Sequence, residues 1–120
     1  MTYETVKFEI ADNIATITLN RPDRLNAMPP VMAEEIGDAL DQLGDARCLL
    51  ITGEGRAFCS GADLAGRADS KQSISGGQGA YRALTRSYNP LMMKLAKLPI
   101  PVVTAVNGPA AGIGCSLALA

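Results

Sequence analysis

The stretch Pro101 to Ala120, PVVTAVNGPAAGIGCSLALA, constrains the fold of this chain more than any other. It opens with an uncharged, largely apolar run over residues 102–106, which is typical of a strand covered on both faces. The tripeptide Asn107-Gly108-Pro109 then supplies strong turn chemistry. Small and apolar residues continue after the turn. The stretch therefore predicts a buried strand, a glycine-rich turn and the start of a helix.

The turn in this stretch also has chemical potential. A helix that starts directly after glycines leaves backbone N–H groups without intrahelical partners and directs them toward one spot. Gly112 and Gly114 permit a close approach of the backbone to another segment. Such donors suit an anion, or an oxygen that becomes anionic during a reaction. Our hypothesis is that this stretch supplies half of an oxyanion hole.

Three other interpretations compete with that hypothesis. A glycine-rich turn between strand and helix is about as often structural as functional. The glycines at 108, 112 and 114 do not form the GxGxxG dinucleotide pattern, and the lysine of a phosphate loop is absent. The uncharged run from Leu98 to Ala120 has the length of a membrane span. Three prolines interrupt it, however, so we expect no contact with a membrane.

Composition excludes several function classes. The chain has 120 residues, of which 48% are hydrophobic and 19% charged, so it is globular rather than disordered. Its 11 basic and 12 acidic residues are scattered and give a net charge of −1. A nucleic-acid partner needs a basic stripe, and none is visible.

The number and spacing of cysteines and histidines limit which disulfides, metal sites and catalytic groups the chain can form. Cys48, Cys59 and Cys115 are odd in number and far apart, which argues against a disulfide framework or a zinc site. The N-terminus carries no secretory signal, so we expect a reducing, cytoplasmic compartment. The chain contains no histidine, which removes histidine triads and histidine metal sites within these residues. We expect no bound metal.

The remaining elements alternate in a way that favours an α/β fold. The turn Ala11-Asp12-Asn13 between two β-type runs indicates a hairpin. Pro29 and Pro30 sit where a helix can start, and Gly44 is a natural stop. We expect Asn89-Pro90 to divide the last predicted helix before residue 101. The predicted elements are strands over Thr5–Ile10, Ile14–Leu19 and Arg47–Thr52 (the last buried), a helix from Pro30 through Leu43, a loop over 67–79 and a helix over Tyr81–Leu98.

The stretch Gly53 to Gly66, GEGRAFCSGADLAG, repeats the pattern of strand, glycines and helix start. Ala62-Asp63-Leu64 can open a short helix, with Ser60 or Asp63 as its cap. An ordinary connection between strand and helix is the alternative. The apolar pattern at the other end of the chain stops at Ala120 without a cap or polar tail. We therefore expect these residues to be the front part of a longer protein.

GRAFCSGADL at 55–64 and PVVTAVNGPAAGIGCSLALA at 101–120 resemble the two signature segments of the enoyl-CoA hydratase/isomerase, or crotonase, superfamily. ITLNRPDRLNAM at 17–28 resembles the family's N-terminal hairpin and the following loop. The similarity covers essentially the whole chain. It implies an α/β spiral of ββα units, with 1–120 as the N-terminal part of a single domain truncated before its C-terminal helical segment. It also implies a homotrimer or homohexamer.

The resemblance implies an acyl-CoA thioester substrate whose enolate oxygen is held by two backbone N–H groups. Motif matching places these donors on Ala62, in Ser-Gly-Ala-Asp, and on Ile113, in Ala-Gly-Ile-Gly. Ile113 replaces the family's common glycine, which narrows the pocket but keeps the main-chain donor. For Arg24, a solvated side chain is an equally good interpretation as a phosphate contact. The positions that resemble substrate-lining ones are Arg24, Leu25, Ala27, Ala62, Asp63, Leu64 and Ile113.

Ser116 bears on the type of reaction. The resemblance implies a glutamate at this position in hydratases and a second glutamate about one repeat later, beyond Ala120. Adding water needs two acid/base groups, whereas a double-bond shift needs one carboxylate. We therefore expect an isomerase, acting by double-bond shift or ring opening, with no cofactor besides the coenzyme A of its substrate. The alternatives are a hydratase or other crotonase-type lyase or hydrolase, and a non-catalytic acyl-CoA-binding member. No base activates Ser116, so we expect it to be inert.

Overall fold

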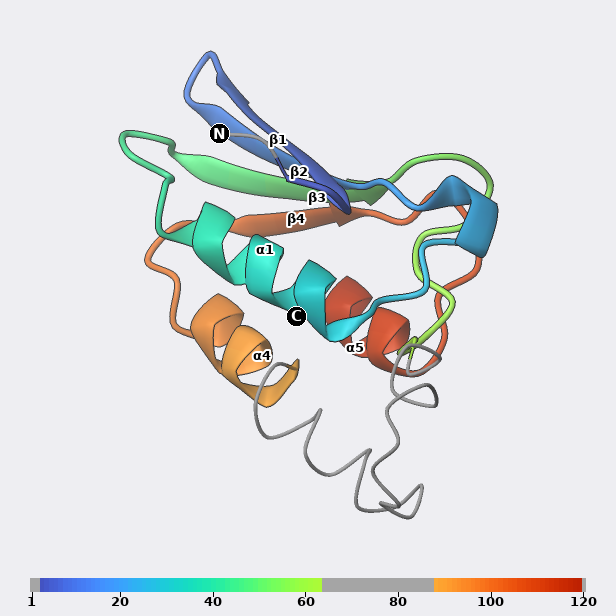
Figure 1. Ribbon diagram of the computed structural model, residues 1–120. Helices are drawn as coiled ribbons and strands as arrows, with labels where there is room; N and C mark the ends of the chain where they lie inside the picture. Colours follow the sequence, from blue (N-terminus) through green and yellow to red (C-terminus); the bar gives the residue numbers. More distant parts are fainter. Residues whose placement is uncertain (1–2, 64–87, 120) are drawn as a thin grey trace.

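The computed structural model describes residues 3–63 and 88–119 of the chain (Figure 1). The loop predicted over 67–79 and the first part of the helix predicted over 81–98 lie outside these residues, as does Leu64. The elements are β1 (Val6–Ala11), β2 (Ile14–Leu19), a 3₁₀ helix η1 (Pro22–Arg24), α1 (Pro30–Leu40), β3 (Cys48–Gly53), α4 (Asn89–Ala96), β4 (Val102–Ala105) and α5 (Ile113–Leu119).

The N-terminal hairpin is confirmed. β1 pairs with β2 in antiparallel register, with Ala11 opposite Ile14. The two turn residues, Asp12 and Asn13, both have left-handed backbone conformations, with φ of 53° and 66°. Two consecutive left-handed residues match the right-handed twist of a hairpin, and Asp and Asn adopt that conformation at little cost.

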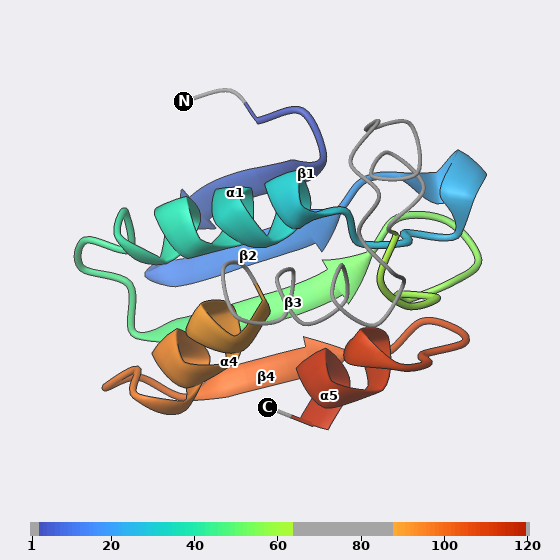
Figure 2. The ribbon, with the colours of Figure 1, turned by 60° about the horizontal axis from the view of Figure 1, so that its bottom comes forward.

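The four strands form one mixed sheet in the order β1-β2-β3-β4. β2 pairs in parallel with β3, and β3 pairs in parallel with β4. Helices α1, α4 and α5 all lie on the same side of this sheet (Figures 1 and 2). Parallel neighbours need a crossover connection, which is usually helical, and α1 lies between β2 and β3 while α4 lies between β3 and β4 in the chain. The predicted α/β architecture is confirmed.

One hydrophobic core lies between the sheet and its helices. Strand residues alternate, so that Ile17 of β2 and Ile51 of β3 are fully buried while Thr16 and Leu50 turn to the open face. Apolar side chains of α1, such as Met32, complete the core from the side of the helices. Its fully buried members on the sheet and α1 are Ala15, Ile17, Leu19, Met32, Ile36, Ala39, Leu49 and Ile51.

The prediction that residues 102–106 form a strand covered on both faces is wrong. Within the described part of the chain, β4 lies at the edge of the sheet and has β3 as its neighbour. The helices cover one face of it, toward which Thr104 donates a hydrogen bond to the carbonyl of Ala118 on α5. Val103 points to the other face and is 54% exposed, and Val106 beyond the strand is 50% exposed. β3, also expected to be buried, is buried on its helix-covered face.

Helix α1 is shorter than predicted. It ends at Leu40, before Leu43 and Gly44. The chain tightens there, because Asp41 and Gln42 donate to the carbonyls of Asp38 and Ala39, three residues back. Gly44, with φ of 55°, lies in the following turn.

Two glycine-to-alanine variants test the packing of α5. A Cβ on Gly114 would lie 2.1 Å from the carbonyl oxygen of Cys59, whereas a Cβ on Gly37 in α1 would meet nothing within 4 Å. We expect Gly114→Ala to lower the free energy of unfolding by about 2–3 kcal/mol through overpacking. Gly37→Ala should raise it by about 0.5–1 kcal/mol through helix propensity. Urea unfolding measures both, and a Gly114→Ala protein as stable as the wild type would contradict the close packing.

Candidate active site

The candidate site is built by three loops that follow β2, β3 and β4. These strands run parallel, so their carboxyl ends lie at the same end of the sheet. In open α/β sheets, ligands bind at that end. The loops are residues 20–29, 54–63 and 106–112, and we call this region the loop end of the sheet.

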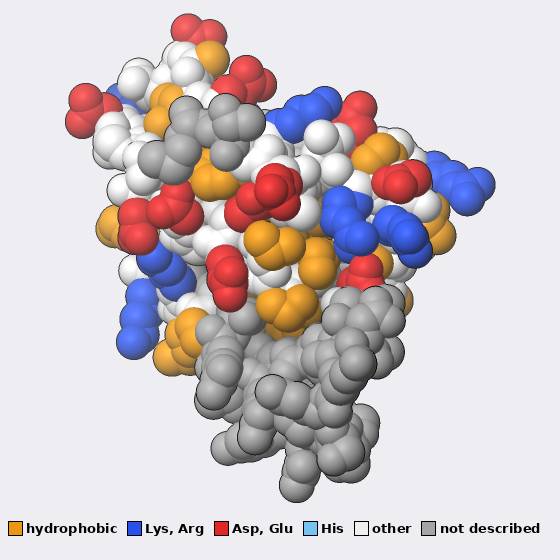
Figure 3. Space-filling model, viewed as in Figure 1, with side chains coloured by type: hydrophobic (Ala, Val, Ile, Leu, Met, Phe, Trp, Pro, Cys, Tyr) orange, Lys and Arg blue, Asp and Glu red, His pale blue; other side chains and the backbone are white. Residues whose placement is uncertain are grey.

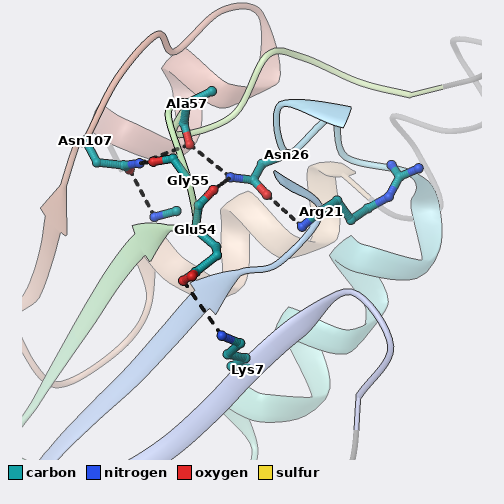
Figure 4. Close-up of polar contacts among 8 residues, drawn as sticks. Lys7, Arg21, Asn26, Glu54, Gly55, Ala57 and Asn107 are labelled. Atoms are coloured by element: carbon teal, nitrogen blue, oxygen red, sulfur yellow. Dashed lines mark hydrogen bonds and ion pairs between the residues drawn. The ribbon is translucent and has the colours of Figure 1, made fainter. Parts of the chain in front are cut away.

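Two asparagine amides hold the loops together (Figure 4). Asn26 is fully buried; its Oδ1 accepts from the N–H of Arg21 at 2.7 Å, and its Nδ2 donates to the carbonyls of Glu54 and Ala57 at 3.0 and 2.9 Å. The Nδ2 of Asn107 donates to the carbonyls of Gly55 and Ala57 at 2.8 and 3.1 Å. The loop after β3 is therefore held from both sides by side chains of its neighbours.

The sequence pattern did not single out Asn26. It lies in the matched segment ITLNRPDRLNAM, and it adopts a left-handed conformation with φ of 55°. Asparagine is one of the few residues that tolerate this conformation. An asparagine between the apolar residues Leu25 and Ala27 was the available signal.

The predicted donor Ala62 lies beside Met28 in an isolated parallel bridge. The N–H of Met28 donates to the carbonyl of Gly61 at 2.8 Å, and the N–H of Asp63 donates to the carbonyl of Met28 at 2.7 Å. Met28 thus bonds the residues on either side of Ala62, and the N–H of Ala62 points away from it. Within the described residues, this N–H donates no hydrogen bond to another backbone group.

The predicted donor Ile113 is the first residue of α5. Cys115 and Ser116 donate to the carbonyl of Gly112, so Ile113 occupies the first helical position, where an N–H has no intrahelical partner. Its N–H likewise donates to no backbone carbonyl in the part of the chain that the structure describes.

The two predicted donors lie on neighbouring segments. Ala62 follows Gly61 and Ile113 follows Gly112, and both glycines have positive φ, 132° and 55°. A Cβ on Gly112 would lie 3.8 Å from the Cα of Gly61. The N–H of Ala111 also donates to the carbonyl of Cys59 at 3.0 Å. The structure therefore brings together the two segments that carry Ala62 and Ile113, whose N–H groups have no backbone acceptor among the described residues.

The other predicted residues lie mainly on the loop after β2. Arg24 ends η1 and is exposed; basic side chains gather on the side of the molecule where η1 lies (Figure 3). Leu25 is left-handed with φ of 52°, is 37% exposed, and accepts a hydrogen bond from the N–H of Ser60 at 3.1 Å. Ala27 is half-buried beside Met28. Leu25 and Ala27 thus lie beside the segment that carries Ala62.

Asp63 has a partner that the sequence pattern did not reveal. Its Oδ2 lies 2.9 Å from Nη1 of Arg21, and both side chains are largely shielded from solvent. The same Nη1 donates to the carbonyl of Ala27 at 2.6 Å.

The prediction of a helix that opens at Ala62 after a Ser60 cap is wrong, because Ala62 lies in the parallel bridge with Met28 and the N–H of Asp63 donates to the Met28 carbonyl. A helix capped by Asp63 would lie beyond the described residues, so that alternative stays open.

Two candidate nucleophiles, the Cys59 thiol and the Ser116 hydroxyl, show no sign of activation among the described residues. Burial raises the pKa of the Cys59 thiol, so this group stays protonated and is a poor nucleophile. Ser116 is exposed on α5.

Among the described residues, no three His, Cys, Asp or Glu side chains cluster as a metal site would require. No described helix has the length and apolar character for crossing a bilayer.

Comparison with known proteins identifies the family. The sequence model of the family described as enoyl-CoA hydratase/isomerase matches residues 9–120. The chain belongs to this family. Membership confirms the resemblance of residues 17–28, 55–64 and 101–120 to the crotonase superfamily.

Some relatives of this chain are named as hydratases, and one is named as an isomerase. A probable enoyl-CoA hydratase of Rhodobacter capsulatus is 43% identical over 100% of this chain and 45% of its own length. The 1,2-epoxyphenylacetyl-CoA isomerase of Escherichia coli is 43% identical over 97% of this chain and 45% of its own. A crystal structure of an enoyl-CoA hydratase/isomerase from Xanthobacter autotrophicus matches with a TM-score of 0.85 and 34% identity, over 98% of this chain and 44% of that one. The chain thus spans less than half the length of these relatives.

Substituting Asn26 tests the hydrogen bonds that hold the loop end. Asn26→Ala removes the partner of the Arg21 N–H and of the Glu54 carbonyl and one of the two amide donors to the Ala57 carbonyl, and we expect it to lower the free energy of unfolding by about 2–3 kcal/mol. The control is Asn20→Ala, because the Asn20 side chain makes no hydrogen bond within the described residues. That variant should change stability by less than about 1 kcal/mol. Equal losses in the two variants, measured by urea unfolding, would contradict the role of Asn26.

Proposed function

We propose that this chain forms the oxyanion hole of an acyl-CoA enzyme, with the backbone N–H groups of Ala62 and Ile113 as donors. The observation that carries the proposal is that these two N–H groups, after Gly61 and Gly112 on touching segments, donate to no backbone carbonyl in the described part of the chain. As a proton leaves the carbon next to a thioester, negative charge develops on the thioester oxygen. Fixed donors aimed at that oxygen stabilise the charged state more than the neutral thioester.

The reaction we propose is an isomerisation, either a double-bond shift or a ring opening. A single carboxylate removes a proton, the electron pair moves onto the thioester oxygen, and the resulting carboxylic acid returns the proton at another carbon. This balance needs neither water nor a cofactor besides the coenzyme A of the substrate. Ser116 supports it, since the family resemblance implies a glutamate there in hydratases. One relative is itself named an isomerase.

The base belongs, in this proposal, to the part of the relatives that this chain does not span. Asp63 is the carboxylate nearest in sequence to Ala62, but it is engaged by the guanidinium of Arg21. This ion pair occupies Oδ2 of Asp63, so we do not assign Asp63 as the base.

The coenzyme portion of the substrate would lie along the loop after β2. Arg24 is exposed and free to approach phosphate, and Leu25 offers an exposed apolar side chain beside the segment of Ala62. We extend the proposal to Ala27, Asp63 and Leu64 as further lining residues. We also propose that the whole protein assembles as a homotrimer or homohexamer.

A hydratase is the second candidate. The relative from Rhodobacter capsulatus is named a probable enoyl-CoA hydratase at the same 43% identity as the isomerase. In that case two acid/base groups would come from outside this chain, since Ser116 offers none.

An isotope experiment separates the two reactions. The protein expressed from its complete reading frame is incubated with a 3-enoyl-CoA or a 2-enoyl-CoA in heavy-oxygen water. We expect double-bond migration with no heavy oxygen in the product, because no water is added. A 3-hydroxyacyl-CoA that carries the label, detected by mass spectrometry, would show a hydratase instead. Binding of acyl-CoA without any turnover would contradict both.

Proline at position 113 tests the donor directly. Ile113→Pro removes the N–H at the first position of α5, where helices accept proline. We expect kcat to fall by about 10²–10³-fold, as for other lost oxyanion donors. Ile113→Ala shortens the side chain but keeps the N–H, so its kcat should stay within about threefold of the wild type. Circular dichroism verifies that both variants fold, and a folded Ile113→Pro enzyme with normal kcat would contradict the assignment.

A further inference from the structure

We propose that Arg21 is a positioning residue that holds the backbone N–H of Ala62 in the oxyanion hole. This inference rests on the function proposed above and adds a residue that acts through others. Arg21 lies at the start of the loop after β2, and its contacts reach the loop after β3.

A single nitrogen of Arg21 contacts both sides of the bridge that carries Ala62. Nη1 lies 2.9 Å from the carboxylate of Asp63 and 2.6 Å from the carbonyl of Ala27. Asp63 directly follows Ala62, and Ala27 directly precedes Met28, the bridge partner of Ala62. The guanidinium therefore ties the two bridged segments together at adjoining residues.

The bridge fixes the direction of the Ala62 N–H through one peptide plane. The carbonyl of Gly61 and the N–H of Ala62 belong to the same planar, trans peptide group, so they point in opposite directions. The N–H of Met28 holds the Gly61 carbonyl at 2.8 Å. The Ala62 N–H must then point to the opposite side. Gly61 itself, with φ of 132°, gives little resistance to rotation, so the bridge and its supports set this direction.

Arg21 is itself well placed to support the bridge. Its N–H donates to the buried amide of Asn26, and its carbonyl accepts from the N–H groups of Arg24 and Asn26 at 2.9 Å. The Arg21 and Asp63 side chains are only 22% and 18% exposed, so solvent and salt screen their attraction less than in a surface pair. A pair held in this way resists small displacements of the loop after β3.

The chain offers a matched control in Lys94 of α4. Lys94 also joins a carboxylate and a backbone carbonyl, those of Asp41 at 2.6 Å and Gly37 at 3.0 Å. Those partners belong to α1 and the residue after it, and lie outside the three loops. Lys94→Met therefore removes an interaction of the same kind without touching the candidate site.

The test compares Arg21→Met and Lys94→Met in the protein expressed from its complete reading frame. Acetoacetyl-CoA is the probe of the oxyanion hole, because its bound enolate gives an ultraviolet band, and butyryl-CoA is the saturated control. We expect Arg21→Met to weaken acetoacetyl-CoA binding and its enolate band by about 10–100-fold, as for a misplaced oxyanion donor. Butyryl-CoA binding should weaken by less than about threefold, because its thioester oxygen stays neutral. Lys94→Met should change neither.

The outcomes distinguish the inference from the function on which it rests. Wild-type protein that neither binds acetoacetyl-CoA nor produces the band contradicts the oxyanion hole, and with it the role of Arg21. A normal band in Arg21→Met, or an equal loss of both ligands, overturns the positioning role alone. Thermal unfolding of both variants verifies that each is folded at the assay temperature. If Arg21→Met does not fold, Arg21→Lys, which keeps the charge but not the planar fork, takes its place and should show a smaller selective loss.

Discussion

The loop end of the sheet depends on the side-chain amide of Asn26. Three loops meet there, with η1 as a short helical turn in the first of them, and their carbonyl and N–H groups need partners where they are shielded from water, because each unpaired one costs stability. Asn26 satisfies three of these groups from a position with no solvent exposure, and Asn107 supports the same loop from the other side. The two side-chain amides supply hydrogen bonds to the backbone that neighbouring strands would supply in a sheet.

Close backbone contact is the second condition for this arrangement. Gly108 and Gly114 let the segment after β4 approach Arg56 and Cys59 more closely than any side chain would allow. Gly61 and Gly112 turn the chain just before Ala62 and Ile113, the two predicted donors. Rigid side-chain amides and permissive glycines thus work together: the first fix the loops, and the second let them touch.

Much of the fold could be predicted from local patterns. The hairpin follows from Asp12 and Asn13, and the helix at Pro30 and the strand near Leu49 follow from spacing of apolar residues. The environment of β4 could not be predicted, because an apolar run describes side chains and not the neighbours that cover them. Val103 is as apolar as Ile51, yet one is half exposed and the other buried.

The candidate site was predicted unevenly for a similar reason. Ala62 and Ile113 could be placed by motif resemblance, although their role as donors remains a prediction. The pair of Arg21 and Asp63 could not be foreseen, since 42 residues separate the partners and no local period links them. The role of Asn26 could not be foreseen for the same reason, because it depends on hydrogen bonds to the carbonyls of Glu54 and Ala57, which are distant in sequence.

The exposed position of β4 has a consequence for how this architecture can grow. An edge strand presents unpaired backbone groups that another strand can join. The three loops are bonded mainly to one another, and their ties to the strands run to β2 and β3. A further strand added beside β4 would therefore enlarge the sheet without displacing them. Such separation lets the size of the scaffold and the geometry of its loops vary independently of each other.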